Sequence, residues 1–498
     1  MFSPDANIFE KYTSPETFAR IRELPSVSAM WSRCLEEYAD APAICDGGET
    51  CTYAELEAQT ARFRTVLTGA HRGGRIGILS PNCLGFVKAF LAVTTLGDTA
   101  VILPAQLDEM SIFGCCMKYG IGTLVYHDDL EAKTAVVRAK NPNIALIPLS
   151  ADAETAAPLC EVSAETPCVV MFTGGTTGKS KGALLSNGAV LQGTVNGCYG
   201  YEEVFGQRYL LVLPLSHVFG LIRNLMTSLY TGSCLYICRN NKDMFRDIAM
   251  FRPTIWVVVP ALAEMALTLS RKFGRNMLGA DMKYIICGAA AVAPYLIEEY
   301  RKLGITVFPG YGLTESANLV SGNPECVEKP DSVGILYPHQ EYRIEDGELW
   351  LRGENMLTSY IGEDEPAYED GWFRTGDLVR LDEEGFLYIT GRVKEIIVLS
   401  NGENVSPAEV EAEFNRLPFV QDSQVFEDIA EGGHHILALE IVPRVTELRG
   451  IDSASMLAAL EEVNRSLPGY QKVNKITIRD SDFARTPSMK IVRYKKCN

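Results

Sequence analysis

The sequence predicts an α/β protein with a large N-terminal domain that holds β-α-β units and several sheets, and a small α+β C-terminal domain. Three observations support this prediction. Strand-like runs alternate with helical segments over residues 75–304, two turn-linked pairs of alternating strands follow from about residue 340, and a compact mixture of helices and strands begins near residue 393. Strands that alternate with helices favour a largely parallel sheet.

The clearest β-α-β unit lies early in the chain. "RIGILSP" (75–81) is strand-like and ends at a proline, "NCLGFVKAFLAVTTLG" (82–97) has apolar residues at helical spacing and a terminal glycine, and "TAVIL" (99–103) is strand-like again. Residues 254–273 and 283–304 each repeat the order of strand and helix. These units predict that the N-terminal domain contains parallel sheets.

Antiparallel hairpins are predicted from about residue 340, where paired strand-like runs replace the alternation of strands and helices. "YRIEDGELWLRG" (342–353) has two alternating runs around Asp346-Gly347, a strong signal for a two-residue turn. "DLVRLDEEGFLYITGR" (377–392) has the same form. We expect a domain boundary directly after this second hairpin, which gives an N-terminal domain over 1–392 and a C-terminal domain over 393–498.

The predicted C-terminal domain is a short α+β sequence with a basic tail. Its expected elements are a strand at 394–400, a helix at 407–418, strands at 423–428 and 435–442, and a helix at 454–468.

Composition excludes several classes of protein. The chain has 498 residues, 47% of them apolar, with a net charge of −17 and a pI of about 5.0. That charge argues against a non-specific nucleic-acid binder, which needs a basic face. The 14 cysteines form no C-x-x-C pair and indicate reduced thiols in a cytoplasmic protein. The sequence leaves the oligomeric state open.

No transmembrane helix is expected. The most apolar stretch, residues 209–238, is split by Arg223 and interrupted by Pro214 and His217, so it falls short of the roughly 20 uninterrupted residues that a spanning helix needs. The N-terminus lacks the basic and apolar regions of a signal peptide. We interpret 209–238 as buried core, although loose contact with a membrane surface remains compatible with it.

A loop rich in glycine and threonine, within "VVMFTGGTTGKSKGALLS" (169–186), has the composition of a phosphate-binding loop. A Walker loop would read G-x-x-x-x-G-K-[ST], but Gly174 and Gly178 enclose only three residues, so a Walker nucleotidase is disfavoured. Backbone N–H groups of the glycines, hydroxyl groups and lysines nevertheless suit a phosphate. The candidate residues are Thr173, Gly174, Gly175, Thr176, Thr177, Gly178 and Lys181.

Four further sequence stretches indicate the kind of protein to which this loop belongs. They are "PGYGLTESANL" (309–319), "WFRTGDLVRL" (372–381), "GRVKEIIVLSNGENVSPAEVE" (391–411) and "ARTPSMKIVRYKK" (484–496). In this order and at these separations they resemble the adenylate-forming superfamily of acyl-CoA synthetases, firefly luciferases and peptide-synthetase adenylation domains. The resemblance runs from "CTYAEL" (51–56) to Lys490, and "TGGTTG" with "TPSMKIVR" is most similar to the fatty acyl-CoA synthetases.

The resemblance implies an AMP-forming acyl-CoA synthetase with the adenylate-forming enzyme fold. ATP and a carboxylic acid, in this branch a fatty acid, would give acyl-adenylate and pyrophosphate with Mg²⁺ as cofactor, and CoA would then give acyl-CoA and AMP. Two alternatives keep the adenylation: loading of a carrier-protein thiol, and an aryl-CoA ligase. A luciferase-like oxygenase or a silent ATP-binding sensor is a third, and the presence of Glu315, Asp377 and Lys490 argues against a silent protein.

The resemblance also implies roles for single residues in ATP binding. The glycine- and threonine-rich loop would grip the β- and γ-phosphates, although Ser180 stands where proline is usual and Gly174 where serine is common. Thr314 would contact the α-phosphate, and Glu315 would hold Mg²⁺, which prefers oxygen ligands. Asp377 would accept hydrogen bonds from the ribose hydroxyls. The remaining ATP- and AMP-binding residues expected are Gly288, Ala289, Ala290, Gly310, Tyr311, which would stack on adenine, Gly312 and Arg392.

Outside the nucleotide site, the resemblance assigns four more residues. Lys490 would be the catalytic lysine that follows the transferring phosphate and carboxylate oxygens as a point charge. Lys394 falls on the family's hinge position, which would let the C-terminal domain rotate between the two half-reactions. His217 and Gly220 would border the acyl pocket, although a histidine in such an apolar segment is also typical of a satisfied core residue.

Overall fold

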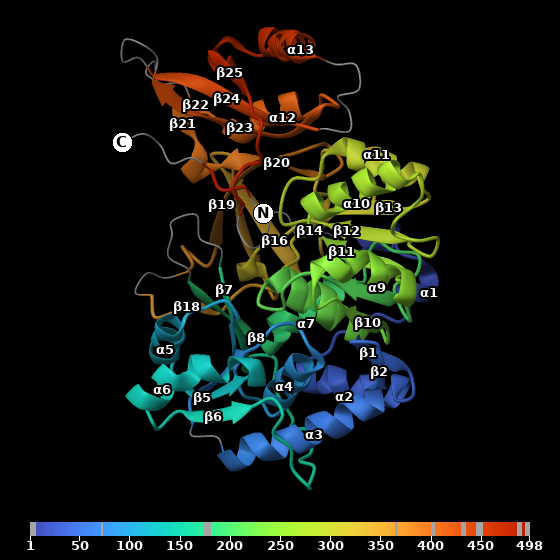
Figure 1. Ribbon diagram of the computed structural model, residues 1–498, viewed down its shortest axis with the longest axis vertical. Helices are drawn as coiled ribbons and strands as arrows, with labels where there is room; N and C mark the ends of the chain where they lie inside the picture. The colour runs from blue at the N-terminus through green and yellow to red at the C-terminus, as the bar shows by residue number, and fades with distance from the viewer. Residues whose placement is uncertain are drawn as a thin grey trace.

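The structure is a computed structural model that describes residues 6–70, 73–173, 181–363, 367–399, 404–429, 435–444, 452–485 and 491–493 (Figure 1). Two large sheets form the body of the N-terminal domain, and the C-terminal domain, orange to red in Figure 1, lies beyond one end of it. This confirms the predicted α/β class, in which a large domain with several sheets is followed by a small α+β domain.

A nine-stranded sheet runs in the order β15-β14-β13-β12-β11-β9-β10-β1-β2. The strands from β13 to β1 are parallel, while β2, β14 and β15 pair antiparallel at the two ends. The strands are β1 (Pro42–Asp46), β2 (Glu49–Thr52), β9 (Arg208–Leu211), β10 (Cys234–Ile237), β11 (Ile255–Val258), β12 (Tyr284–Cys287), β13 (Thr306–Tyr311), β14 (Ser321–Gly322) and β15 (Ile335–Leu336). The parallel order places the carboxyl ends of β11, β12 and β13 side by side.

A seven-stranded sheet runs in the order β18-β8-β7-β4-β3-β5-β6. Its parallel part includes the predicted unit, in which β3 pairs with β4 and α4 connects them. The strands are β3 (Arg75–Leu79), β4 (Ala100–Leu103), β5 (Ile121–Tyr126), β6 (Ala145–Pro148), β7 (Pro167–Phe172), β8 (Gly182–Ser186) and β18 (Ser359–Ile361). Strand β18 reaches this sheet from far along the chain and pairs antiparallel with β8.

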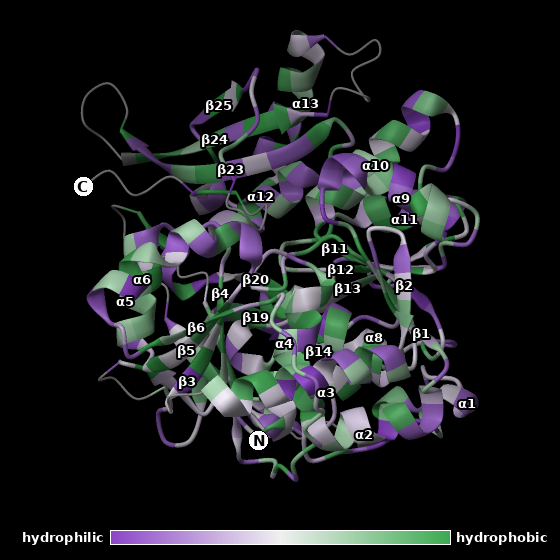
Figure 2. Ribbon diagram, turned by 60° about the horizontal axis from the view of Figure 1, so that its bottom comes forward, coloured by the Kyte–Doolittle hydropathy of each residue, from purple (hydrophilic) through white to green (hydrophobic). Residues whose placement is uncertain are grey.

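Helices cover both sheets, and side-chain caps start several of them. Ser26, Asp108 and Ser186 accept hydrogen bonds from the backbone N–H three residues on, which satisfies one free donor at the start of each helix. Helix α10 carries both hydrophobic and hydrophilic residues, and its buried residues recur at helical spacing, as expected of a covering helix (Figure 2). The helices of the N-terminal domain are α1 (Pro15–Phe18), α2 (Val27–Tyr38), α3 (Tyr53–Ala70), α4 (Leu84–Thr95), α5 (Glu109–Lys118), α6 (Ala135–Lys140), α7 (Asn187–Asn196), α8 (Thr227–Tyr230), α9 (Met244–Phe251), α10 (Pro260–Phe273) and α11 (Pro294–Lys302).

The two predicted hairpins form a four-stranded antiparallel sheet of β16 (Gln340–Glu345), β17 (Glu348–Gly353), β19 (Phe373–Leu381) and β20 (Leu387–Arg392). Asp346 and Gly347 have φ of 49° and 80°, the left-handed backbone that a tight two-residue turn requires. This sheet joins the large body to the C-terminal domain, because β20 is the last strand before it (Figure 1).

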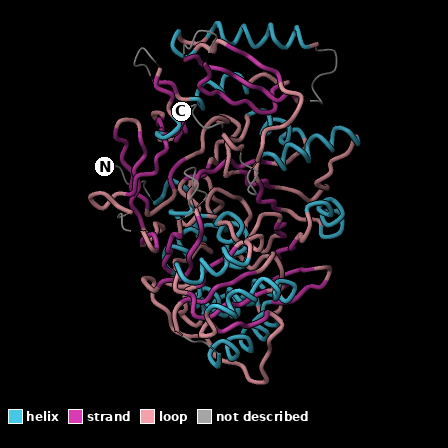
Figure 3. The backbone as a smooth tube through the Cα atoms, turned by 60° about the vertical axis from the view of Figure 1, so that its left-hand side comes forward, coloured by secondary structure: helices cyan, strands magenta, loops and turns pink. Residues whose placement is uncertain are grey.

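The C-terminal domain has a hydrophobic core of its own, drawn from residues 397–473. In Figure 3 its helices and strands gather at one end of the molecule, apart from the rest. Its elements are β21 (Ile397–Val398), β22 (Asn404–Val405), α12 (Pro407–Asn415), β23 (Val420–Ile429), β24 (His435–Pro443), α13 (Ser453–Ser466) and β25 (Lys475–Ile478).

One predicted strand of this domain is wrong in extent. Residues 394–400 were expected to form a single strand, but Val393–Glu395 forms a 3₁₀ turn and only Ile397–Val398 pairs, with the equally short β22. The reason is that the only pairing partner in the described chain is two residues long.

Arg444 connects the two domains. Its guanidinium forms an ion pair with Glu264 of α10, and its Cζ lies 3.9 Å from the centroid of the Tyr295 ring. The arginine side chain is 5% exposed, so the contact is withdrawn from water. In this arrangement the small domain is docked against helices α10 and α11 of the large one.

The apolar stretch 209–238 is buried, as predicted. It forms β9, a π-helix over Phe219–Met226, α8 and β10, and its hydrophobic side chains belong to the main core. In the described part of the chain, no helix combines the length and the apolar character required to cross a bilayer.

Every cysteine in the described ranges is a free thiol. Cys160 is exposed, Cys115 is half-buried and the others are buried. Burial raises the pKa of several of these thiols, including that of Cys198 to about 12, so those thiols are neutral hydrophobic residues of the core.

Candidate functional site

The site begins at the carboxyl ends of β12 and β13, where two backbones approach closely. A Cβ atom on Gly288 would lie 3.2 Å from the carbonyl oxygen of Gly310 and 3.6 Å from the Phe219 ring. Ala289 follows in the left-handed region with φ of 65°, and Ala290 is exposed. Positive φ is uncommon for a residue with a side chain and tends to occur at functional turns. At this edge the backbones of β12 and β13 are therefore closely packed, and the chain turns at Ala289.

Tyr311, Asp377 and Arg392 lie together. Tyr311 ends β13, and its hydroxyl donates to Oδ2 of Asp377 at 2.6 Å. Arg392 holds the other oxygen of Asp377, with Nε 2.8 Å from Oδ1. The antiparallel register of β19 and β20 pairs Asp377 directly with Arg392. Asp377 is 2% exposed, so its carboxylate oxygens are held in fixed positions.

The pKa of Tyr311 is raised well above its usual value, by burial first and by the Asp377 carboxylate second. The phenol therefore stays protonated at neutral pH and remains a hydrogen-bond donor to Asp377. A role in core packing alone does not explain a half-buried tyrosine whose hydroxyl meets a carboxylate at the end of a strand.

A tight loop after β13 carries Thr314 and Glu315. The 3₁₀ turn Thr314–Ser316 is closed by hydrogen bonds between Leu313 and Ser316, and Ala317 and Asn318 follow with φ of 47° and 83°. Gly312 is required here because a Cβ atom on it would lie 1.2 Å from the carbonyl oxygen of Asn318. Thr314 is buried, and the loop holds Glu315 beside β18.

Glu315 is held by Tyr360, a residue that the sequence analysis missed. The Tyr360 hydroxyl donates to Oε1 of Glu315 at 2.7 Å. Burial raises the pKa of Glu315, and the Tyr360 hydrogen bond opposes part of that rise. Tyr360 lies in β18, where it pairs with Ala183 of β8. Its only signal in the sequence is an aromatic residue in a three-residue strand, which is too weak to have identified it.

The glycine- and threonine-rich loop starts and ends at this site. The backbones of Thr173 and Lys181 are joined by a hydrogen bond of 2.9 Å at the base of the loop, where β7 and β8 pair. The ammonium group of Lys181 lies 5.0 Å from the centroid of the Tyr360 ring. The predicted residues Gly174, Gly175, Thr176, Thr177 and Gly178 lie outside the described residues.

The residues present fit one Mg²⁺ shared with a phosphate ligand. Among the described residues there is no group of three or more histidine, cysteine, aspartate or glutamate side chains that would hold a metal ion alone. Mg²⁺ in nucleotide sites is commonly bound by one or two carboxylates together with phosphate oxygens. Glu315 supplies such a carboxylate: it is half-buried, and one of its oxygens accepts a hydrogen bond from Tyr360.

His217 and Gly220 lie at the start of the π-helix after β9. The backbone N–H of Phe219 donates to Nδ1 of His217 at 3.2 Å, which fixes the half-buried imidazole. A Cβ atom on Gly220 would lie 2.4 Å from the carbonyl oxygen of Pro214, so close packing of the helix start requires glycine there. Phe219 between them faces Gly288, which connects this segment to the site.

Of the two predicted lysines of the C-terminal domain, only Lys394 lies within the described residues. Lys394 is exposed within the 3₁₀ turn that follows β20. Lys490 lies outside the described residues, and the residues on either side of its segment, Arg485 and Ile491, form an isolated β-bridge.

Comparison with known proteins places the chain among described enzymes. Residues 31–361, more than half of the chain, match the family model described as AMP-binding enzyme. The indoleacetate–CoA ligase of Aromatoleum aromaticum is 32% identical over 335 residues, 64% of each chain. The long-chain-fatty-acid–CoA ligase of Haemophilus influenzae is 26% identical over 97% of each chain.

A solved structure with the same fold is the o-succinylbenzoate CoA synthetase of Bacillus subtilis bound to its acyl-adenylate intermediate. It is 26% identical, covers 95% of this chain and 98% of its own, and superimposes with a TM-score of 0.77. Another structure of that synthetase contains ATP and a magnesium ion.

Proposed function

Since the chain belongs to the AMP-binding enzyme family and is an AMP-forming acid–CoA ligase, we propose that it activates an aliphatic carboxylic acid as acyl-adenylate and transfers the acyl group to CoA. The carboxylate would attack the α-phosphorus of ATP and release pyrophosphate. The CoA thiol would then attack the acyl carbon and release AMP. The relative from Haemophilus influenzae, which matches over 97% of the chain, supports a fatty acid as substrate.

The observation that carries this proposal is a pair of hydrogen-bonded carboxylates: Asp377, within β19, and Glu315, in the 3₁₀ turn that follows β13. Asp377 has both oxygens ordered by Tyr311 and Arg392, as recognition of two ribose hydroxyls would need. Glu315 accepts a hydrogen bond from Tyr360, over whose ring the Lys181 ammonium group lies, and its carboxylate would stabilise a phosphate-bound cation. Bound Mg²⁺ would neutralise charge on the phosphates during transfer. Adenylation depends mainly on such positioning and electrostatic stabilisation.

The other predicted residues take their roles within this proposal. The Gly288-Ala289-Ala290 backbone and Tyr311 would enclose the adenine, and Thr314 with the loop from Thr173 to Lys181 would contact the phosphates. Lys490 would contact the transferring group as the catalytic lysine. His217 and Gly220 would border the acid.

We also propose that the chain divides into domains 1–392 and 393–498, with Lys394 as the hinge. The separate core of the C-terminal domain and the exposed turn Val393–Glu395 support this division. A rotation about one short segment would let the same site serve adenylation and then thioester formation.

The proposal is tested by offering the purified protein ATP, Mg²⁺, a panel of aliphatic and aryl acids, and either CoA or a carrier protein. We expect pyrophosphate exchange with aliphatic acids and thioester only with CoA. Thioester on the carrier protein alone would overturn the choice of acceptor. Activity confined to aryl acids, such as that of the indoleacetate relative, would overturn the choice of acid, and no exchange with any acid would overturn the reaction.

A further inference from the structure

Arg223, in the π-helix, is a buried cation without an acidic partner. Its residue is 1% exposed, its Nη2 donates to the Tyr201 hydroxyl at 2.9 Å, and its Nη1 is buried without a hydrogen-bond partner. The fully buried Arg64 shows the usual arrangement: its guanidinium contacts the Glu57 carboxylate, the Thr95 hydroxyl and the Ala157 carbonyl. Within the described ranges no ion pair involves Arg223, so its charge is not neutralised by the fold.

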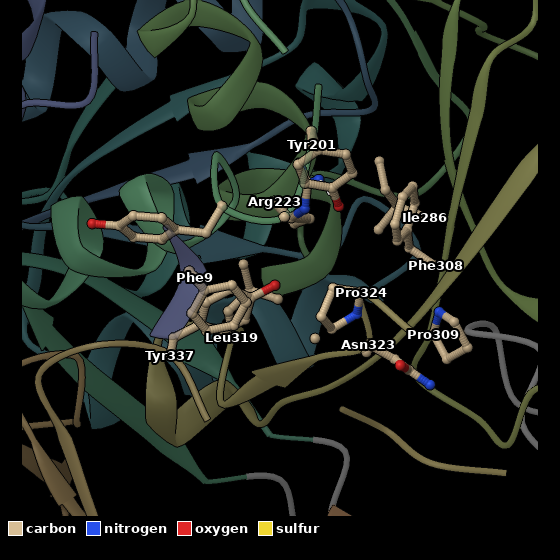
Figure 4. Close-up of a pocket in the computed structure, with 14 residues that line it drawn as sticks. Phe9, Tyr201, Arg223, Ile286, Phe308, Pro309, Leu319, Asn323, Pro324 and Tyr337 are labelled. Atoms are coloured by element: carbon tan, nitrogen blue, oxygen red, sulfur yellow. Dashed lines mark hydrogen bonds between the residues drawn. The ribbon is translucent and has the colours of Figure 1, made fainter. Parts of the chain in front are cut away.

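Arg223 lines a small pocket (Figure 4). The walls are mainly aromatic, and the side chains that line the pocket include no acid: they are Phe9, Tyr199, Tyr201, Phe308, Leu319 and Tyr337 among others. Burial raises the pKa of Tyr199 to about 12 and that of Tyr337 further, so these phenols stay neutral. The pocket is therefore apolar around a single positive charge.

This pocket continues the proposed acid site. Ile286 and Phe308 line it and are paired in β12 and β13. Gly310 of β13 lines the pocket as well, and a Cβ atom on Gly288, directly after β12, would lie 3.2 Å from the Gly310 carbonyl oxygen. Phe219, which faces Gly288, lies roughly one helical turn before Arg223. An acid bordered by His217 and Gly220, as we propose, would extend past Phe219 toward Arg223.

An arginine cannot avoid the cost of burial by losing its proton, and a buried charge is normally paired. An anionic ligand would supply the missing partner through the free Nη1. Resting on the proposed function, we propose that Arg223 binds a second, distal carboxylate of the acid substrate. The preferred substrates are then aliphatic dicarboxylic acids rather than simple fatty acids.

The experiment measures pyrophosphate exchange with matched acids, the diacids succinate to suberate against the monoacids butyrate to octanoate. We expect the wild-type protein to have a higher kcat/KM for at least one diacid than for the monoacid of equal length. In Arg223→Met that preference should fall by about 10- to 100-fold, the range for loss of one charged hydrogen bond. The loss should appear mainly in KM of the diacid, and Arg223→Lys should restore part of it.

The exposed Arg239→Met, which also removes a guanidinium, is the matched control and should leave the preference unchanged. A purely structural arginine would lower activity with both classes of acid equally, and that result would overturn the inference. If Arg223→Met does not fold, the wild-type protein alone tests the inference. A kcat/KM for every monoacid that equals that for the diacid of the same length would overturn it. Absence of exchange with all acids would instead refute the proposed function on which the inference rests.

Discussion

Glu315 is a residue whose burial opposes folding. Folding raises the pKa of this carboxyl group, mainly because burial disfavours the charged form. The resulting cost in folding free energy is absent below the pKa that Glu315 has in the unfolded chain. It grows as pH rises toward the pKa of Glu315 in the folded protein, and it applies fully above that pKa. Above its folded pKa the ionised Glu315 therefore lowers the free energy of unfolding, as expected of a group retained for chemistry rather than for stability.

Glu315→Gln should separate these two effects. Glutamine keeps an oxygen that accepts from Tyr360 but loses the charge, so adenylation should fall on the order of 100-fold because the cation and phosphates lose a carboxylate. The melting temperature at pH 7 without ATP should equal or exceed that of the wild type. Glu345→Gln, at an exposed position of β16, is the control. A variant that loses stability together with activity would contradict this interpretation.

Tyr360→Phe should move the pH dependence of the reaction. The wild-type rate of adenylation should decline as acidic pH protonates Glu315. Removal of the Tyr360 hydroxyl removes a hydrogen bond that lowers the pKa of Glu315, so the acidic limb of the kcat/KM profile should shift to higher pH. Tyr388→Phe removes a comparable bond from tyrosine to Asp382 far from Glu315 and should leave the limb in place. An unshifted limb in Tyr360→Phe would show that this bond does not tune Glu315.

At the scale of elements, the loop between β13 and β14 decides where Thr314 and Glu315 lie. Its shape depends on the close approach of Gly312 to Asn318 and on two left-handed residues after the 3₁₀ turn. Several backbone constraints meet within this short stretch of chain. These constraints fix the path of the backbone between β13 and β14, and with it the positions of Thr314 and Glu315.

Gly312→Ala should disrupt this loop. The new Cβ atom would overlap the Asn318 carbonyl at 1.2 Å, and such overpacking typically costs about 1–3 kcal/mol of unfolding free energy. Adenylation should fall with it, because Glu315 moves. Gly114→Ala adds a methyl group to helix α5 with nothing within 4 Å and should be neutral or stabilising by up to about 1 kcal/mol. Equal melting temperatures and activities in both variants would refute the prediction.

The elements that the sequence predicts well are those that local signals determine. The unit β3–α4–β4 and the Asp346–Gly347 hairpin follow from alternation, helical spacing and a turn dipeptide. Tyr360 was missed because its place depends on pairing between Ser359–Ile361 and Gly182–Leu184, segments far apart in the chain. Arg223 appeared in the sequence only as an interruption of an apolar run, since the absence of an acidic partner is a property of the folded core.

At the scale of the whole molecule, the contact of Arg444 with Glu264 and Tyr295 holds the small domain in one position. This contact joins one buried arginine of the small domain to helices α10 and α11 of the large domain. A rotation of the C-terminal domain about Lys394 would have to break this contact. The two half-reactions should therefore be separable by mutation.

Lys394→Pro should stop the rotation that we propose. Proline fixes φ near −65° and restricts the preceding residue, Val393. We expect pyrophosphate exchange close to the wild-type rate and a collapse of thioester formation from supplied acyl-adenylate. Glu383→Pro, at the second position of the turn between β19 and β20 where proline is tolerated, is the control. Loss of both half-reactions would indicate general damage, and loss of neither would refute the hinge.

Lys490→Ala should give the opposite pattern. Loss of one charge aimed at the transferring group should slow adenylation on the order of 100- to 1000-fold. Thioester formation from supplied acyl-adenylate should survive much better. Exchange within about threefold of the wild type would refute the assignment of the catalytic lysine.

The burial of the cysteines makes the protein suitable for optical measurement. Once Cys497, which lies outside the described residues, is replaced by serine, a maleimide dye should react first at Cys160, the exposed thiol of the large domain. A cysteine introduced at the exposed Ser453 of α13 would accept a second dye on the small domain. Resonance energy transfer between the two dyes would then report domain position in single molecules, while the thiols of the core keep their native packing.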